Sequence, residues 1–265
     1  MRGDGIDRDT VLDVLEAATR FAHEAGEITL RYFGGLVDAE SKGDGSPVTM
    51  ADREAEEHIR KRIEERWPEH GILGEEFGVT REDAPIRWIL DPIDGTRSFM
   101  RGVPLYGVLI GVEGPDGPFV GVAHFPALGE TVAAGEGLGC LWNGNPCAVS
   151  NVGELDWSLI LTTDAERILS RPEGQGFRSL MQGSSFSRTW GDCYGHILVA
   201  TGRAEAMVDP ILSSWDAGPL LTILTEAGGT FTDLQGRRTI HGGSGISSNG
   251  RMHPLVLEAL RRGEA

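Results

Sequence analysis

The first third of the chain changes from a helical to a strand-like pattern of hydrophobic positions. In residues 10–33 the apolar side chains recur every three or four positions, which predicts a helix that ends at Gly34-Gly35. A second helix is expected over residues 52–66, because acidic side chains come first and basic ones last. Residues 86–90 form a short apolar run, which is typical of a buried strand.

The middle of the chain is rich in strand patterns that are separated by turn residues. Residues 105–112 predict a central strand, and the runs at 119–125, 130–134 and 139–142 predict an antiparallel meander. The Asn-Gly pair at 143–144 favours a tight hairpin turn. Helices before this block and strands within it indicate α+β layers rather than a repeated βαβ unit.

The second half alternates shorter elements. We expect strands over residues 158–162, 185–190 and 204–209, and helices over residues 164–170, 192–201 and 216–227. Residues 172–176 contain proline and glycine and are expected to form a flexible link.

Two carboxylates follow the strand predicted at 86–90. Asp91 is the first residue after it, and Asp94 follows after Pro92 and Ile93. Proline biases the residue before it toward an extended conformation, and Gly95 allows a sharp turn, so both side chains and the Ile93 carbonyl can converge. Clustered oxygens at a strand end suit a hard cation such as Mg²⁺. The alternative is an ordinary solvated turn, because Asp-Pro and Asp-Gly are common turn pairs.

Three more acidic positions stand at the ends of predicted elements. Asp52 begins the second helix, Glu75-Glu76 lies between two glycines, and Asp216 begins a later helix. Each has a simpler explanation, as a helix cap or a solvated surface. Pro219 is expected within the first turn of the later helix, where proline is tolerated.

Charge and cysteine content narrow the class of protein. The 265 residues carry a formal net charge of -16, which argues against nucleic acid or an anionic membrane as partner. Three cysteines without close pair spacing make a disulfide framework or a zinc site unexpected and favour a reducing cytoplasm. We also expect no signal peptide and no membrane span.

Taken together, the acidic stretches resemble the inositol monophosphatase family of magnesium-dependent phosphatases. The resemblance covers about residues 42–249. It rests on four stretches in order: Pro47-x-Thr49-x-Ala51-Asp52, Gly74-Glu75-Glu76, Trp88-Ile89-Leu90-Asp91-Pro92-Ile93-Asp94-Gly95-Thr96, and Trp215-Asp216 with Glu226-Ala227-Gly228-Gly229. It implies an α/β (α+β) fold, a layered αβαβα sandwich of the inositol monophosphatase and fructose-bisphosphatase type. It also implies a homodimer.

The resemblance implies two halves and a ligand set for the metals. Residues 1–150 would form an α+β half with most ligands, and residues 151–265 an α/β half with the last ligand and the substrate side, in one compact catalytic unit. The first Mg²⁺ would be held by Glu75, Asp91 and the Ile93 carbonyl, and the second by Asp91, Asp94 and Asp216. A third, weaker ion can assist, and Mn²⁺ can substitute.

Other matched positions receive roles around the attacking water and the phosphate. Glu75 and Thr96 would orient the water, and Asp52 would orient Thr96 or steady the metal-bound waters. Lys42 matches a loop lysine near the site. Gly95 and Thr96 would present backbone N–H groups to the phosphate. Asp94 would also contact the substrate.

The substrate side resembles the histidinol-phosphatase branch of the family. The resemblance lies in residues 188–195, which begin with Arg188, and in residues 204–210, and it assigns Arg188, Asp192 and Asp209 to substrate binding. Histidinol phosphate carries an ammonium and an imidazole, which carboxylates can bind through charge-assisted hydrogen bonds. The alternatives are that Asp192 only caps a helix and that Asp209 is only a turn residue.

The resemblance therefore implies a phosphatase that acts on a small, cationic phosphate monoester. Two other functions stay open. One is an inositol-1-monophosphatase or a broad sugar-phosphate phosphatase with the same metals. The other is an inactive regulator that only binds phosphate.

Overall fold

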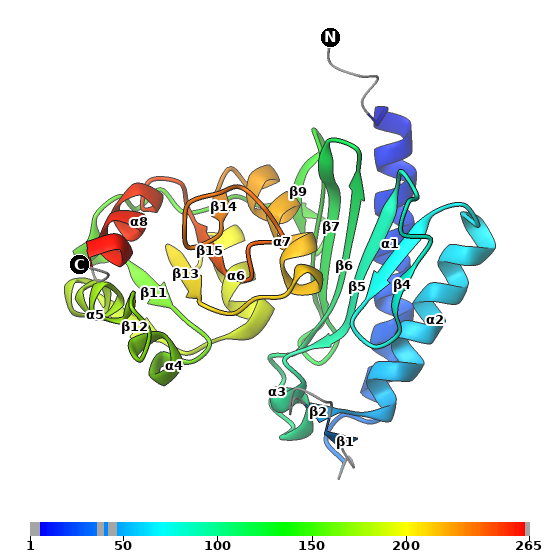
Figure 1. Cartoon of the computed structure of the whole chain (residues 1–265), viewed down its shortest axis with the longest axis horizontal. Coiled ribbons are helices and arrows are strands. Elements are labelled where there is room, and N and C mark those ends of the chain that lie inside the picture. Colours follow the sequence, from blue (N-terminus) through cyan, green and yellow to red (C-terminus); the bar gives the residue numbers. More distant parts are fainter. Residues whose placement is uncertain (1–5, 36–39, 42–46, 263–265) are drawn as a thin grey trace.

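The chain folds into five layers, and the computed structural model describes residues 6–35, 40–41 and 47–262. From one side of Figure 1 to the other, the layers are two helices, an eight-stranded sheet, two helices, a five-stranded sheet and a last group of helices. The predicted α/β class and its αβαβα layering are confirmed.

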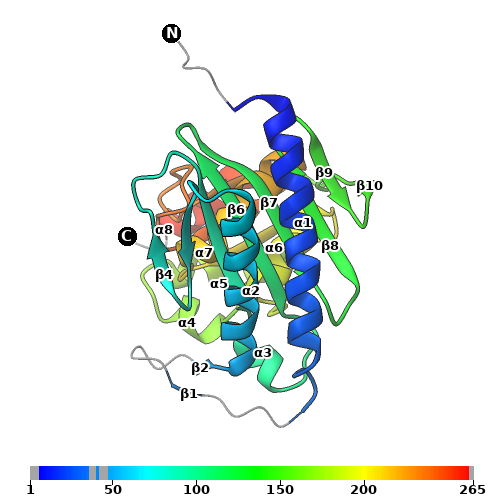
Figure 2. The same cartoon turned by 90° about the vertical axis from the view of Figure 1, so that its right-hand side faces the viewer.

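Helices α1 (Arg8–Leu30) and α2 (Met50–Arg66) form the first layer. Figure 2 shows them side by side across the outer face of the large sheet. The apolar side of α1, including Val14 and Phe21, is buried. Asp7 caps α1 by accepting a hydrogen bond from the Thr10 N–H at 2.9 Å.

The large sheet has the strand order β10-β9-β8-β7-β6-β5-β3-β4. Its strands are β3 (Gly71–Gly74), β4 (Gly78–Thr80), β5 (Arg87–Asp94), β6 (Gly107–Gly114), β7 (Gly117–Phe125), β8 (Glu130–Gly135), β9 (Gly139–Trp142) and β10 (Asn145–Pro146). Among the described strands of this sheet, β3 and β5 pair in parallel and all other neighbours are antiparallel. The antiparallel meander predicted for the runs between residues 119 and 142 is thus confirmed.

Helices α6 (Asp192–Ala200) and α7 (Ser214–Glu226) lie between the two sheets. The prediction that Pro219 stands in the first turn of its helix is wrong, because it is the sixth residue of α7. Two glycines of the large sheet leave space for the backbone of α7 at Gly218 and Pro219. A Cβ atom on Gly121 would lie 2.2 Å from the Pro219 carbonyl oxygen, and one on Gly111 would lie 2.8 Å from the Gly218 carbonyl carbon. This close approach fixes α7, and with it the start of the helix, against the sheet.

The second sheet has the order β12-β11-β13-β15-β14. Its strands are β11 (Leu159–Leu161), β12 (Phe186–Arg188), β13 (Ala206–Asp209), β14 (Thr230–Thr232) and β15 (Gly245–Ser248). Strand β11 runs parallel to both β12 and β13, with helices in the connections. Helical crossovers between parallel strands are thus present in this half, which agrees with the alternation of strands and helices predicted for it.

The outermost layer contains α4 (Ala165–Leu169), α5 (Gly174–Gly183) and α8 (His253–Arg262). The prediction of a flexible link at 172–176 is wrong, because α5 begins inside it. Its glycines serve close packing, since a Cβ atom on Gly176 would lie 2.0 Å from the Ala259 carbonyl oxygen of α8. The apolar residues Phe177 and Leu180 keep a helical spacing, but the proline and glycines before them favour a break in the sequence pattern.

The short elements are β1 (Glu40–Ser41), β2 (Pro47–Val48), α3 (Thr96–Met100) and a 3₁₀ turn at Leu155–Trp157. Among the described residues, no helix is both long and apolar enough to cross a bilayer.

A shared core joins the two sheets. One cluster of buried side chains contains Ile89 and Leu109 of the large sheet together with Leu220 and Ile223 of α7 and Met207 of the small sheet. The large sheet ends at Pro146 and the small one begins at Leu159. The proposed division near residue 150 falls between them, and the shared core fits one compact unit.

Candidate active site

The end of β5 and the turn after it hold two of the predicted ligands. Asp91 is 2% exposed, and its Oδ1 accepts a hydrogen bond from the Ile93 N–H at 3.0 Å. The pairing of β5 with β6 is irregular between Asp91 and Asp94, so the chain bends there. Gly95 follows with a left-handed φ of 80° and turns the chain into α3.

Asp216 reaches the same place from the first turn of α7. Its Oδ2 accepts a hydrogen bond from the Ser213 N–H at 2.7 Å, within a capping box. One carboxylate oxygen from each of Asp91, Asp94 and Asp216 lies within 4.8 Å of the other two. The simpler explanation of Asp216 as a helix cap is therefore correct, and the same carboxylate also belongs to an acidic cluster.

Glu75 follows β3 at the same end of the sheet. Parallel pairing aligns Gly74 with Leu90, and the Glu75 N–H donates to the Leu90 carbonyl at 3.1 Å. This register places Glu75 beside Asp91, because the carboxyl ends of neighbouring parallel strands meet at one edge. The predicted first-ion ligands thus lie on adjacent strands.

A buried carboxylate holds the turn that carries Glu75. Glu56 of α2 is fully buried, and its oxygens accept hydrogen bonds from the backbone N–H groups of Glu76 at 2.8 Å and Phe77 at 3.2 Å. Arg60 donates to the same carboxylate at 2.7 Å. A Cβ atom on Gly74 would lie 2.0 Å from Glu56 Oε1, so only glycine fits there.

Asp52 and Thr96 have defined local partners. Asp52 is fully buried at the third position of α2, and its Oδ2 accepts hydrogen bonds from the Thr49 N–H at 2.8 Å and the Thr49 hydroxyl at 2.5 Å. The Thr96 hydroxyl donates to the Ile93 carbonyl at 3.1 Å. That carbonyl has a second lone pair and can still accept another partner. The role of Asp52 toward Thr96 stays a prediction.

The carboxylates of the cluster raise one another's pKa. Burial raises the pKa of Asp91 well above its ordinary value, and the charges of Glu75, Asp94 and Asp216 raise it further. Burial likewise raises the pKa of Asp94, with the charges of Asp192 and Asp216 acting in the same direction. Burial also raises the pKa of Asp216 to about 7. The cluster therefore has an excess of negative charge that a cation would relieve.

The donors fit a hard divalent cation. After burial, the charges that raise the pKa of Asp91 are those of three other carboxyl groups, Glu75, Asp94 and Asp216. Three carboxylates that converge within 4.8 Å offer the oxygen ligands that hard cations take in proteins. The residues present thus fit a site for a hard divalent metal ion.

A pocket of about 510 Å³ opens next to the cluster. It is lined by Gly95, Thr96, Arg97, Thr163, Asp164, Ala165, Thr189 and Asp192. The lining comes from the turn after β5, the end of β11, the start of α4 and the start of α6. A ligand in it would contact both halves of the chain.

Asp192 has a strained backbone at the edge of this pocket. Its φ is 52°, in the left-handed region that non-glycine residues seldom occupy. Its N–H donates to the Thr163 hydroxyl at 2.8 Å, which helps to hold this conformation. Burial raises its pKa to about 6, and the charge of Asp209 adds to the effect. Strain of this kind is concentrated at functional sites.

Asp209 is buried behind the pocket and holds the lining residue Thr163 in place. It is 2% exposed and accepts hydrogen bonds from the Thr163 N–H at 2.9 Å and the Thr163 hydroxyl at 2.7 Å, with His196 Nε2 at 3.3 Å. Among the described residues, the lining does not include Asp209 or Arg188. Arg188 is exposed and donates to the Ser187 carbonyl at 2.7 Å. Substrate binding by either residue stays a prediction, and Lys42 lies outside the described residues.

Five lining residues were not among the candidate site residues: Arg97, Thr163, Asp164, Ala165 and Thr189. Thr163 and Asp164 lie in the short connection between β11 and α4, and Arg97 follows Thr96. Polar residues just after a strand are a usual source of site residues, so Thr163 could have been suspected. Its partner Asp209 stands 46 positions further on, and only the fold brings them together.

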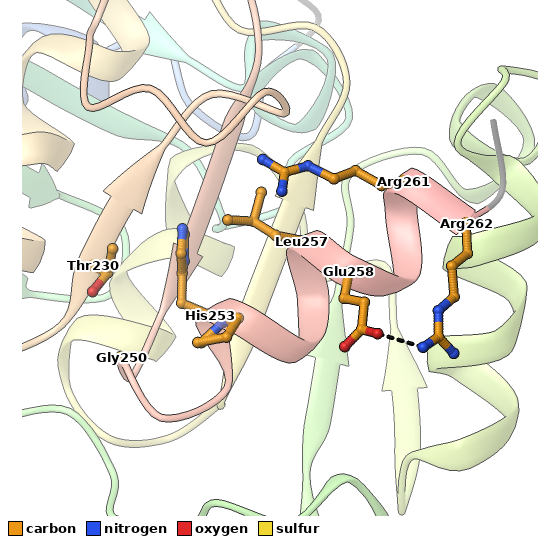
Figure 3. A pocket seen from close by; sticks show the side chains of 8 residues that line it. Thr230, Gly250, His253, Leu257, Glu258, Arg261 and Arg262 are labelled. Atoms are coloured by element: carbon orange, nitrogen blue, oxygen red, sulfur yellow. Dashed lines mark hydrogen bonds and ion pairs between the residues drawn. The ribbon is translucent and has the colours of Figure 1, made fainter. Parts of the chain in front are cut away.

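A second hollow, of about 690 Å³, lies beside α8 (Figure 3). His253 lines it, but both ring nitrogens already have partners, with Thr232 Oγ1 at 3.0 Å and Ser248 Oγ at 2.9 Å. Glu258 and Arg262 pair with each other along the helix. Arg261 donates to the Gln235 carbonyl at 3.1 Å. The titratable side chains that line this hollow in the described part of the chain are thus already paired, which favours the smaller pocket as the site.

Comparison with known proteins identifies the family to which the chain belongs. The inositol monophosphatase family profile matches residues 11–265. A histidinol-phosphatase of Chlorobaculum parvum is 45% identical over 252 residues, covering 94% of this chain and 97% of that protein. One from Streptomyces coelicolor is 36% identical over 261 residues, covering 95% of this chain and 98% of that protein. The structure of an inositol monophosphatase from Zymomonas mobilis is 32% identical, with a TM-score of 0.84, and covers 97% of this chain and 100% of that chain. The chain belongs to the inositol monophosphatase family.

Proposed function

We propose that this protein is a Mg²⁺-dependent phosphatase that hydrolyses histidinol phosphate to histidinol and phosphate, a step of histidine biosynthesis. The observation that carries the proposal is the convergence of Asp91, Asp94 and Asp216 next to the pocket lined by Asp192. One side of this arrangement suits metal ions and a phosphate. The other side suits a positively charged substituent.

The metal assignment follows from the oxygen donors. Glu75, Asp91 and the Ile93 carbonyl would hold one ion, and Asp91, Asp94 and Asp216 a second, with a third, weaker ion in assistance. Bound Mg²⁺ would neutralise the phosphate dianion and lower the pKa of water, and Mn²⁺ can take its place. The raised pKa values of the carboxyls favour this assignment, because a cation would restore their ionised forms.

The remaining residues would orient the reactants. The Glu75 carboxylate would accept a hydrogen bond from the attacking water, with Thr96 as a second partner whose hydroxyl position is set by the Ile93 carbonyl. Backbone N–H groups of Gly95 and Thr96 would donate to the phosphate oxygens. Asp52 would support Thr96 from the start of α2.

The choice of histidinol phosphate depends on Asp192. An ionised carboxylate in the pocket would form charge-assisted hydrogen bonds with an ammonium or imidazolium, and a neutral polyol would gain less from it. Asp209 would keep Asp192 in place through Thr163, because one hydroxyl links the two residues. The names of the two histidinol-phosphatase relatives favour the same substrate.

An inositol or sugar phosphatase is the alternative within this family, because its metal ligands would be the same. An inactive regulator is less favoured, since every position assigned to a metal within the described residues offers an oxygen donor. We further propose a homodimer located in the cytoplasm, with the two halves of each chain divided near residue 150. Its partner would be a small, cationic phosphate monoester, and neither nucleic acid nor a membrane would bind.

The metal requirement provides the test of catalysis. Phosphate release from histidinol phosphate is measured after removal of divalent ions by a chelator, and then during a titration with Mg²⁺. We expect no release in chelator and a saturable return of activity with added Mg²⁺. Full activity in chelator, or no activity at any Mg²⁺ concentration, would contradict the proposal.

A further inference from the structure

Two cysteines face each other across the hairpin at the outer edge of the large sheet. Strands β9 and β10 pair Asn145 with Trp142 and Pro146 with Leu141, so Cys147 follows opposite Cys140. The Cys147 N–H donates to the Cys140 carbonyl at 3.0 Å, and the two sulfur atoms lie 3.5 Å apart. Both thiols are free, and neither belongs to the site described above.

This placement suits a disulfide that forms without rearrangement of the backbone. Opposite residues in a hydrogen-bonded antiparallel pair have Cα atoms about 5.5 Å apart, which is within the range that a disulfide spans. The chain is already held at this spacing by the hairpin. Bond formation therefore needs mainly a rotation of the two side chains.

The two thiols differ in reactivity. Cys140 is buried, and its hydrogen bond to Cys147, followed by burial, raises the pKa of the Cys140 thiol. Cys147 is half-buried, and its hydrogen bond with Cys140 lowers the pKa of the Cys147 thiol, with the positive charge of Arg203 acting in the same direction against burial. Arg203 is anchored by Glu130 at 2.9 Å. Cys147 is thus the thiolate that an oxidant meets first.

Cys193 provides a contrast within the same chain. It is buried, with only 1% of the residue exposed to solvent. An enclosed thiol reacts slowly with peroxides, because the oxidant cannot reach the sulfur. Oxidation should therefore select the hairpin pair and leave this third cysteine reduced.

We propose that Cys140 and Cys147 form a reversible, peroxide-sensitive dithiol–disulfide pair. The Cys147 thiolate attacks one oxygen of hydrogen peroxide, so that an S–O bond forms, the O–O bond breaks, and the departing hydroxide takes up a proton as water. The Cys140 sulfur then attacks the Cys147 sulfur, the S–S bond forms, and the S–O oxygen leaves as a second water with the Cys140 proton. The two sulfurs lose two electrons and the peroxide gains two, and a dithiol reductant reverses the change.

Peptide mapping of the full chain tests this. The protein is treated with hydrogen peroxide, the remaining thiols are alkylated, and chymotrypsin is used to cut after Trp142, between the two cysteines. We expect a disulfide-linked pair of peptides containing Cys140 and Cys147, an alkylated Cys193, and loss of the link after dithiol treatment. A Cys147 oxidised to sulfinic acid with Cys140 alkylated, or a link that joins two chains, would overturn the proposal.

Two single variants separate the roles of the thiols. In Cys140→Ser, peroxide should leave Cys147 as a sulfenic acid that a dimedone probe labels, because the partner thiol is missing. In Cys147→Ser, Cys140 should stay reduced at the same peroxide dose. Equal oxidation of Cys140 in the presence and absence of Cys147 would contradict the assignment.

Discussion

The backbone N–H of Cys193 donates a hydrogen bond to Asp94 Oδ2 at 2.6 Å, which ties the first turn of α6 to the end of β5. Asp192 stands next to this contact, and a Cβ atom on Gly95 would lie 3.1 Å from Asp192 Oδ2. The acidic cluster and the substrate pocket are thereby held in one fixed arrangement. A change at Asp94 should disturb the metals first, and a change at Asp192 the choice of substrate.

Asp94→Asn should remove a metal ligand charge while keeping the shape of the side chain. The amide oxygen can still accept the Cys193 N–H, so the fold should persist. We expect the turnover of histidinol phosphate at saturating Mg²⁺ to fall by roughly a thousandfold, about 4 kcal/mol of lost transition-state stabilisation. Asp116→Asn, in an exposed turn, is the control. Near-normal turnover in Asp94→Asn would remove Asp94 from the site.

Asp192→Asn should alter the choice of substrate more than catalysis in general. Loss of the charge should reduce kcat/KM for histidinol phosphate by about tenfold to a hundredfold, in line with ~1.5–3 kcal/mol for a charged hydrogen bond. Hydrolysis of a neutral ester such as inositol 1-phosphate should change much less. Steady-state kinetics with both esters measure the difference. Equal losses for the two would limit Asp192 to a structural role at the start of α6.

The stability of the metal-free protein should fall as the pH rises toward neutrality. The pKa of Asp216 is about 7 in the folded chain, against an ordinary value of 3.8. The folded state thus keeps a proton that the unfolded chain has lost. The resulting stabilisation is fully present below about pH 4 and is lost as the pH rises through about 7. Asp192, with a pKa of about 6, contributes in the same direction over a narrower range.

Thermal unfolding in chelator between about pH 5 and about pH 7.5 tests whether the stability decreases as the pH rises. The midpoint should decrease with pH in the wild type and decrease less in Asp216→Asn. Added Mg²⁺ should stabilise more at the higher pH, by about 2.7 kcal/mol at a hundred times its dissociation constant, because protons and metal compete for the same carboxylates. Identical pH profiles for the wild type and Asp216→Asn would contradict the raised pKa.

Glu56→Gln should weaken metal binding although Glu56 is not one of the proposed metal ligands. The Glu56 carboxylate holds the N–H groups of Glu76 and Phe77, and glutamine keeps only one acceptor oxygen for them. The turn that carries Glu75 should loosen, with a loss of Mg²⁺ affinity of about tenfold, as for other groups that support metal ligands. Calorimetric titration measures the affinity. Glu57→Gln changes the exposed neighbour and serves as control.

An unchanged Mg²⁺ affinity in a folded Glu56→Gln protein would show that the turn needs no support from α2. A loss in both variants would indicate a general effect of charge rather than an effect of position.

The predicted part of the site is the part in which neighbours in sequence are neighbours in space. Asp91, Pro92, Asp94 and Gly95 determine their own geometry, because proline, glycine and a strand end act within a few residues. The capping position of Asp216 could also be read locally. These features are set by backbone preferences that the sequence alone expresses.

The pocket could not be predicted in the same way. Thr163 and Asp209 meet only because β11 and β13 pair in parallel. The left-handed Asp192 is maintained by that contact and breaks the usual residue preference. Helix α5 was missed because Gly174 and Gly176 at its start are typical of a loop, whereas Gly176 in fact allows close contact with α8. Tertiary packing decides each of these features.

The measurement that tests the central claim most directly is phosphate release from histidinol phosphate and from inositol 1-phosphate, side by side, with and without Mg²⁺. The account predicts a kcat/KM for histidinol phosphate that is higher by at least about a hundredfold and is lost without the metal. An equal or greater kcat/KM for inositol 1-phosphate would contradict the substrate assignment. Equal release of phosphate in chelator would contradict the metal site itself.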